Sequence, residues 1–311
     1  MGKLLGICVS DRRGIQKKEI ERAELKAGWG IEGDAHAGKW HRQVSLLSYE
    51  KIEEFRNRGA SVDFGAFGEN LIIEGFDFRA LPVGTRFHIG EAVLELSQIG
   101  KECHSHCEIY KVMGDCIMPR EGVFTEVLKG GAIQVGDEVT MEPPEADRPF
   151  TAAVITLSDK GAKGEREDLS GPKIVEMLEK EGYEIKETLL LADEQKALEH
   201  QLRRLADQRQ VNVIFTTGGT GFSVRDVTPE ATIAVCDRMA NGIADAIRNY
   251  SMAITKRAMF SRAVSGIRKR TLIVNLPGSP KAVAEALDFL LPQLSHGLGI
   301  LRGTEGECAR K

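Results

Sequence analysis

The sequence contains no apolar run that approaches the roughly 18–20 residues needed by a membrane-spanning helix. Its N-terminus, Met1 to Leu5, leads directly into an expected strand and lacks the long apolar segment of a signal peptide. Gly2 does not indicate N-myristoylation, because Gly6 occupies the position where that motif requires Ser or Thr. We therefore expect a cytoplasmic protein that neither spans nor contacts a membrane.

The chain also has no excess of basic residues over acidic residues. The chain has 42 Lys and Arg against 46 Asp and Glu, a formal net charge of −4 and a pI near 6.1. Without a basic stripe, nucleic acid is not an expected partner. Cysteines are few, at 6 in 311 residues. In a reducing compartment they are expected to be thiols or metal ligands rather than a disulfide framework.

The rest of the sequence divides into halves with different patterns. Residues 1–142 contain short apolar runs broken by glycine and polar turns, which favour a closed or barrel-like sheet. Residues 150–311 alternate strand and helix patterns, which predicts a three-layer α/β domain with a mostly parallel sheet. Residues 143–149 contain three prolines and are expected to form a short, stiff linker. The predicted fold class is thus mainly-β followed by α/β.

Individual strands follow from the apolar runs. In the first half they are expected at 4–9, 44–47, 70–73, 86–89, 92–96 and 122–127, with a hairpin joining 87–90 to 92–96. In the second half they are expected at 152–157, 184–190, 211–216 and 271–275. Two helices are expected from apolar stripes, one carrying Ile174, Met177 and Leu178, the other beginning near Glu194 and carrying Leu198, Leu202 and Leu205.

The most informative stretch follows the expected strand at 211–216. It reads Thr217-Gly218-Gly219-Thr220-Gly221. Glycines adopt positive φ and leave backbone amides bare, so that successive amides converge on an anion. Thr228 then suits the N-cap of a helix with Pro229 at its first position. A strand, a glycine loop, an acid and a helix in this order predict a phosphate-binding site.

The loops that begin at Ser158, Gly218 and Pro277 each follow an expected strand. Ligand sites of parallel sheets lie at the carboxyl ends of the strands. We therefore expect these loops to meet at one edge of the sheet.

The string from Thr216 to Glu230 resembles the signature of the molybdenum cofactor biosynthesis family that includes molybdopterin adenylyltransferase, T-x-G-G-T-G followed by R-D-V-T-P-E/D. Further segments match in order: Ser158-Asp159-Lys160, Gly164, Asp168-Leu169-Ser170-Gly171-Pro172, Asp193-Glu194, Ser261-Arg262 with Gly266, and Asn275-Leu276-Pro277-Gly278-Ser279-Pro280. Two positions depart from the family pattern. Lys160 stands where arginine is usual, and Ala192 replaces a proline.

The resemblance implies that molybdopterin's terminal phosphate attacks the α-phosphate of ATP, giving adenylyl-molybdopterin and pyrophosphate. Such a reaction needs positioning and charge neutralisation more than covalent catalysis. The glycine loop would hold a phosphate. Further binding residues are expected in the matching loops: Ser158, Asp168, Ser170, Arg225, Pro277, Gly278 and Ser279. Asp193 and Asp226 match the family's functional aspartates and would hold Mg²⁺.

Each of these acidic and basic residues also has a structural interpretation. Asp193 precedes a helix and suits an N-cap. Asp226 has no such alternative, because Thr228 is expected to cap its helix, so Asp226 is the stronger catalytic candidate. Arg225 could bind phosphate or brace the loop.

The first half resembles the MOSC domain, named after the C-terminal part of molybdenum cofactor sulfurase. The matching stretches are Gly33 to Gly38, His41 to Leu47, Phe67 to Leu71, Ile99 to Cys107, Gly114 to Pro119, Gly122 to Phe124 and Gly130 to Asp137. This resemblance implies that a cysteine carries sulfur or binds the cofactor, and Cys103 aligns best with it.

Cys103 has cationic neighbours in Lys101 and His104, which favour the reactive thiolate. Two alternatives remain: a buried, inert thiol, or a structural zinc site that Cys103 shares with Cys107, Cys116, His104 and His106.

Cys8, Cys236 and Cys308 are expected to be thiols that are buried or at the surface. His36 and His41 fit a site or a hydrogen-bonded scaffold equally well. Phe64, Phe67, Phe76 and Phe78 are expected in the core.

Three functions fit these observations. The first is a fused enzyme that adenylylates molybdopterin and handles the cofactor or its sulfur in the MOSC domain. The second is a carrier that binds and delivers molybdopterin or molybdenum cofactor without catalysis. The third, a MOSC-dependent reductase of N-hydroxylated compounds, is less favoured because no redox-partner domain is visible. Expected partners are molybdopterin, ATP, and other cofactor-biosynthesis proteins or molybdoenzymes, with a homotrimer implied by the resemblance.

Overall fold

A computed structural model describes residues 1–59, 61–102, 110 and 114–305. The chain forms two compact units, Met1–Glu145 and Ala146–Lys311. Each unit has its own hydrophobic core.

The first unit is a closed β-barrel, as the short apolar runs predict. Among the described residues, seven strands neighbour one another in a ring: β1 (Gly2–Val9), β6 (Leu71–Glu74), β5 (Val44–Ser48), β9 (Val123–Lys129), β8 (Ala92–Ile99), β7 (Arg86–Ile89) and β11 (Glu138–Glu142). Pairing of β11 with β1 closes the ring. The expected hairpin is confirmed by the antiparallel pairing of β7 with β8.

Shorter elements surround the ring. Strand β2 (Lys18–Ile20) pairs with β1, and β10 (Gly131–Gln134), β3 (Arg22–Lys26) and β4 (Gly30–Ile31) form a separate sheet. The described helices of this unit are short: α1 (Tyr49–Arg56), η1 (Phe78–Ala80) and α3 (Met118–Glu121).

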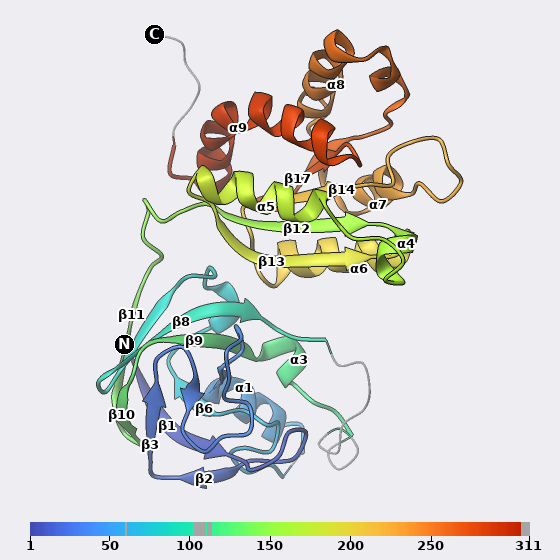
Figure 1. The fold of residues 1–311 in the computed structure, drawn as a ribbon. Coiled ribbons are helices and arrows are strands. Elements are labelled where there is room, and N and C mark those ends of the chain that lie inside the picture. The colour runs from blue at the N-terminus through green and yellow to red at the C-terminus, as the bar shows by residue number, and fades with distance from the viewer. Residues whose placement is uncertain (60, 103–109, 111–113, 306–311) are drawn as a thin grey trace. The chain divides into compact units, whose positions relative to one another are not determined.

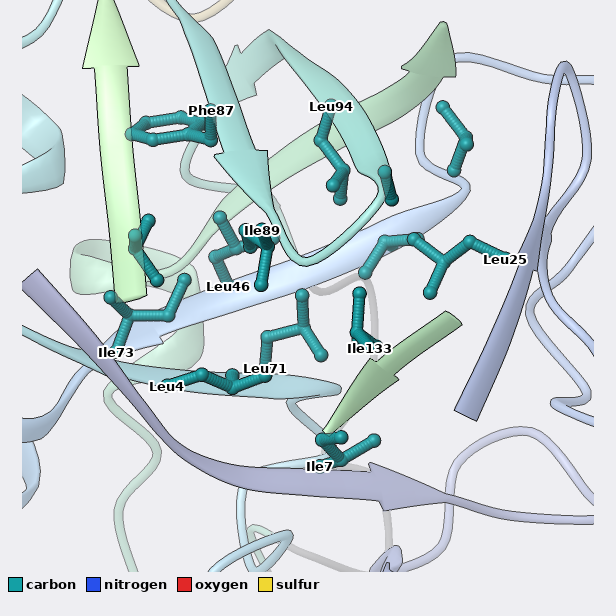
Figure 2. Close-up of a cluster of buried hydrophobic side chains, with 14 of the residues drawn as sticks. Leu4, Ile7, Leu25, Leu46, Leu71, Ile73, Phe87, Ile89, Leu94 and Ile133 are labelled. Atoms are coloured by element: carbon teal, nitrogen blue, oxygen red, sulfur yellow. The ribbon is translucent and has the colours of Figure 1, made fainter. Parts of the chain in front are cut away.

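Apolar side chains that alternate with partly exposed ones along the strands fill the interior of the barrel. In β8, Ala92, Leu94 and Leu96 are buried while Val93 and Glu95 are partly exposed. Figure 2 shows Leu94 with Phe87, Ile89, Leu46 and Leu71 in one interior cluster. A second cluster lies under α1. The core prediction is confirmed for Phe67, Phe76 and Phe78, and Phe64 is partly buried against the second cluster.

The second unit has a single sheet in the order β13 (Glu184–Leu191), β12 (Thr151–Leu157), β14 (Val213–Thr217), β17 (Thr271–Leu276), β16 (Ser265–Arg268) and β15 (Arg238–Met239). The first four strands are parallel, whereas β16 pairs antiparallel with β17 and β15 pairs antiparallel with β16. The expectation of a mostly parallel sheet is therefore confirmed.

Helices cover both faces of this sheet (Figure 1). Ala152 and Val154 pack with α5 (Ser170–Lys180), α8 (Gly242–Ile254) and α9 (Pro280–Arg302), whereas Ala153 and Ile155 pack with α6 (Gln195–Asp207) and α7 (Thr228–Val235). Consecutive strand residues point to opposite faces, so the stretch of β12 from Ala152 to Ile155 is apolar at every position. Short elements α4 (Asp159–Ala162) and η2 (Lys256–Phe260) complete the described unit.

Two details at helix ends differ from the sequence interpretation. Helix α7 begins at Thr228 itself, its N-cap is Val227, and the buried Thr228 hydroxyl donates instead to the carbonyl of Gly218 at 2.9 Å. The N-cap of α6 is Glu194, so Asp193 is not a cap. Among the helices that the structure describes, none is both long and apolar enough to cross a membrane.

Candidate functional site

Three parallel strands end side by side at the carboxyl edge of the second sheet. Thr156 of β12 is level with Thr217 of β14, which is level with Leu276 of β17. The loops that follow these strands enclose a cleft of about 280 Å³. The cleft is lined by several residues predicted from the sequence: Ser158, Asp168, Ser170, Asp193, Thr217, Gly218, Gly219, Asp226 and Gly278.

The glycine loop has a backbone that only glycine tolerates at two positions. Gly218 has a φ of +91°, and a Cβ added there would lie 2.3 Å from the carbonyl oxygen of Leu157. Gly219 has a φ of +64°, and its added Cβ would lie 2.5 Å from Thr228 Oγ1. Both residues combine positive φ with close approach of other atoms, which explains the glycine pair.

Hydroxyl groups tie the loops together. Thr217 Oγ1 donates to the Pro277 carbonyl at 2.6 Å, and Ser170 Oγ donates to the Gly278 carbonyl at 3.0 Å. Ser158 and Ser279 accept hydrogen bonds from the backbone of the helices they precede. Because the hydroxyls of Ser158 and Ser279 accept these hydrogen bonds, each can still donate its own proton. The Ser170 hydroxyl already donates its proton to the Gly278 carbonyl.

Two carboxylates line the cleft beside the glycine loop. Asp193 Oδ2 accepts from the backbone N–H of Asp159 at 2.9 Å, and Asp226 Oδ2 accepts from that of Ser223 at 2.9 Å. Within the described part of the chain, Oδ1 of neither residue receives a hydrogen bond. Burial raises the pKa of Asp193, and the negative charges of Asp159 and Asp226 raise it further. The site thus concentrates negative charge near the glycine loop.

Arg225 braces the loops, which is one of the two roles that the sequence leaves open. Its guanidinium forms two hydrogen bonds with Asp159, at 2.8 and 2.9 Å, and one with Glu194 at 2.7 Å. These hydrogen bonds hold the pKa of Asp159 below its usual range. Arg225 therefore joins the glycine-loop segment to the loops after β12 and β13.

Sequence reasoning did not single out some residues of this site. Arg262 donates to the carbonyls of Gly221 and Asp226, each at 2.6 Å, and so fixes the segment between them. Its only signal was its place in the matching Ser261-Arg262 element. Asp159 was quoted only as part of a matching element, and Arg166, which lines the cleft, had no distinguishing signal.

In the first unit, several residues of the matching stretches that are described have polar partners. Lys17 Nζ lies 2.7 Å from Asp34 Oδ1, and both side chains are almost fully buried. Asn70 Oδ1 accepts from the Ser45 hydroxyl at 2.9 Å while its amide donates to the Cys8 carbonyl at 3.0 Å. His41 Nε2 lies 2.8 Å from Gln98 Oε1.

The cysteines are only partly within the described residues. Cys8 is fully buried, and burial raises its thiol pKa. Cys116 is also buried, and burial raises the pKa of Cys236 to about 11. Such thiols are poor nucleophiles. Cys103, His104, His106, Cys107 and Cys308 lie outside the described residues.

Comparison with known proteins gives two family matches. Residues 153–296 match the family described as the probable molybdopterin binding domain, and residues 33–140 match the MOSC domain. The molybdopterin adenylyltransferase of Helicobacter pylori strain J99 is 38% identical over 157 residues, which are 48% of this chain and 86% of that protein. The molybdopterin adenylyltransferase of Escherichia coli K12 is 40% identical over 138 residues, or 43% of this chain and 70% of that protein.

Among solved structures, the molybdopterin biosynthesis enzyme MoaB of Thermus thermophilus is 42% identical, with a TM-score of 0.48, over 50% of this chain and 97% of that one. These sequence matches show that the chain belongs, through residues 153–296, to the family of the probable molybdopterin binding domain. The same chain also contains a MOSC domain over residues 33–140.

Proposed function

We propose that the second unit adenylylates molybdopterin in molybdenum cofactor biosynthesis. The terminal phosphate oxygen of molybdopterin attacks the α-phosphorus of ATP, a new P–O bond forms, and the bond to pyrophosphate breaks. The observation that carries this proposal is the cleft where the Gly218-Gly219 loop meets the carboxylates of Asp193 and Asp226. Relatives at 38% and 40% identity that are named molybdopterin adenylyltransferases support it.

The residues divide the work. The loop from Thr217 to Gly221 brings backbone close to the phosphates, and Ser158 and Ser279 donate hydroxyl hydrogen bonds to them. Asp168 and Pro277 shape the cleft. Ser170, Arg225 and Gly278 keep its loops in register, as their contacts indicate.

Mg²⁺ fits the donor set of this cleft. Asp193 and Asp226 each have one oxygen without a hydrogen bond from the described residues, and the pKa of Asp193 is raised by burial and by neighbouring negative charge. A divalent cation relieves that repulsion, and Mg²⁺ prefers carboxylates together with substrate phosphates. When bound, the ion would neutralise charge on the phosphates.

The test is pyrophosphate release by the full chain with molybdopterin, ATP and Mg²⁺. Asp226→Asn keeps the acceptor for Ser223 but removes the charge, so turnover is expected to fall by a factor of about 10² or more, with molybdopterin binding retained. Asp288→Asn is the matched control, because Asp288 is exposed on α9 outside the cleft. A wild-type protein that binds molybdopterin but never consumes ATP would establish the carrier function instead.

We further propose that the MOSC domain handles sulfur or cofactor through Cys103. The match over residues 33–140 and the neighbouring Lys101 support this role. Iodoacetamide should label Cys103 rapidly near neutral pH, whereas Cys8 and Cys236 should react slowly because burial raises their pKa. Labelling should be lost in Cys103→Ser and kept in Cys107→Ser.

Metal analysis gives the opposing outcome for Cys103. A structural zinc site would hold about one equivalent of metal, protect Cys103 from alkylation and unfold on chelation. That result would exclude a carrier thiol. Three expectations stay predictions: a cytoplasmic location, a homotrimer and partner molybdoenzymes. Light scattering of the purified chain tests the homotrimer.

A further inference from the structure

A larger groove adjoins the phosphate cleft on the α5 face of the sheet. It has a volume of about 520 Å³ and lies between α5 and the strands β12 and β13. Its walls are mainly apolar and include Val154, Val175 and Leu190. It shares Thr156 and Asp168 with the cleft, so the two spaces meet at these residues.

The meeting point carries an unused hydrogen-bonding group. Thr156 is only 6% exposed, and its hydroxyl has no hydrogen-bond partner among the residues described. Buried hydroxyl groups are normally paired, so an unpaired one at a cavity wall indicates a missing partner. Thr156 points to the same face of β12 as Val154, which lines the groove.

Asp168 supplies an acceptor at the same place. Its Oδ1 accepts from the backbone N–H groups of Ser170 and Gly171, both at 3.0 Å. No described residue donates to Oδ2. A Cβ added to Gly171 would lie 2.4 Å from this oxygen and 2.7 Å from Thr156 Oγ1. Glycine at position 171 therefore leaves room for both polar atoms, which a side chain there would displace.

We propose that this groove binds the flat, amino-substituted heteroaromatic ring of a substrate whose phosphates lie in the glycine-loop cleft. The apolar walls contact the ring faces, and the Thr156 hydroxyl and Asp168 Oδ2 pair with ring nitrogen and amino groups. Glu179 lines the groove and disfavours an anionic group there, which directs the phosphate end to the cleft, whereas the charge of Glu176 is balanced by Lys173 and Lys180. This deepens the proposed adenylylation and rests on it for the phosphate position.

The purine of ATP and the pterin of molybdopterin share this ring chemistry, and titrations of the full chain distinguish them. ATP, molybdopterin and inorganic triphosphate are titrated separately into wild type and Val175→Trp, whose indole fills the groove. Affinity for the ligand whose ring occupies the groove should fall at least about 10-fold. Inorganic triphosphate should bind unchanged. Glu181→Trp adds the same side chain at the exposed C-cap of α5, outside the groove, and should change nothing.

Thr156→Val is the second variant, because it removes the hydroxyl while keeping the shape of the side chain. It should weaken the same ligand by about 5-fold, the effect of one hydrogen bond. If folded Val175→Trp and Thr156→Val bind ATP and molybdopterin as wild type does, the groove assignment is wrong. If wild type binds both ligands and the variants weaken one, but pyrophosphate never forms, the catalytic proposal fails and the groove assignment stands.

Discussion

Asp34 and Lys17 illustrate how much a buried charge depends on its partner. Burial alone raises the pKa of Asp34, but the His36 ring and the Lys17 ammonium outweigh it and hold the pKa well below the usual range. Burial lowers the pKa of Lys17, and Asp34 opposes this effect. Each charge is therefore tolerated in the barrel unit because the other is present.

Asp34→Asn should destabilise the first unit by about 3–5 kcal/mol at neutral pH, because the Lys17 ammonium loses its buried counter-charge. Asp11→Asn is the control, since its side chain is 87% exposed. Both tryptophans, Trp29 and Trp40, lie in this unit, so tryptophan fluorescence during urea unfolding reports on it alone. A loss no larger than that of the control would contradict the assigned role of the pair.

The same pair sets a pH dependence. A carboxyl with a lowered folded-state pKa stabilises the fold above its unfolded pKa, which is about 4, and this stability is lost as pH falls further. The urea midpoint of the wild-type first unit should therefore fall below about pH 4. In Asp34→Asn, this decrease of the urea midpoint below about pH 4 should disappear.

At the scale of elements, the glycine loop and helix α7 form one assembly. Thr228 donates its hydroxyl proton to the Gly218 carbonyl, and its backbone N–H donates to the Gly219 carbonyl at 3.1 Å. Asn275 of β17 donates to the hydroxyls of Thr216 and Thr232 beneath the loop, each at 2.9 Å. The loop conformation is thus fixed by a neighbouring strand and helix as well as by its own glycines.

Gly218→Ala should destabilise the second unit by at least about 1–3 kcal/mol and lower turnover, because it combines positive φ with a clash against Leu157. Gly297→Ala is the matched substitution inside α9, where an added Cβ meets nothing within 4 Å. It should stabilise the unit by up to about 1 kcal/mol. Thermal unfolding, monitored by circular dichroism, measures the stability of each variant, and pyrophosphate release measures its turnover. Equal effects of the two substitutions would refute the backbone argument.

At the scale of the molecule, the chain has two units with separate cores. Contacts within each unit secure the chain near their boundary. Arg86 pairs with Glu145 at 2.5 Å, and Arg302 donates to the carbonyls of Arg148 and Pro149 at 2.6 and 2.9 Å. These polar groups near the boundary thus have partners in their own unit.

A fragment of residues 146–311 should therefore fold alone and release pyrophosphate from ATP and molybdopterin at a rate within a few-fold of the full chain. A fragment of residues 1–145 should fold without catalysing this reaction. Circular dichroism and the pyrophosphate assay test both. A 146–311 fragment that folds but is inactive would show that adenylylation needs the MOSC domain.

The sequence by itself determined the elements whose cause is local. Short apolar runs predicted the β7–β8 hairpin and the strands β12, β14 and β17, because strands with buried faces need apolar side chains. It did not predict the long helix α9, whose extent depends on the sheet face it covers. The glycine pair was recognised from its composition and order alone.

Only the tertiary structure decided what each polar side chain does. Asp193 fitted a helix cap from sequence, but it lines the cleft because Asp159, 34 positions earlier, donates its N–H to it. Thr228 suited a cap, yet its hydroxyl bonds to Gly218 across the loop. The bracing contacts of Arg225 with Asp159 and Glu194 could not be predicted from the sequence, because these partners lie 66 and 31 positions earlier. Local sequence sets backbone preference, whereas a side chain chooses among partners that only folding brings within hydrogen-bonding distance.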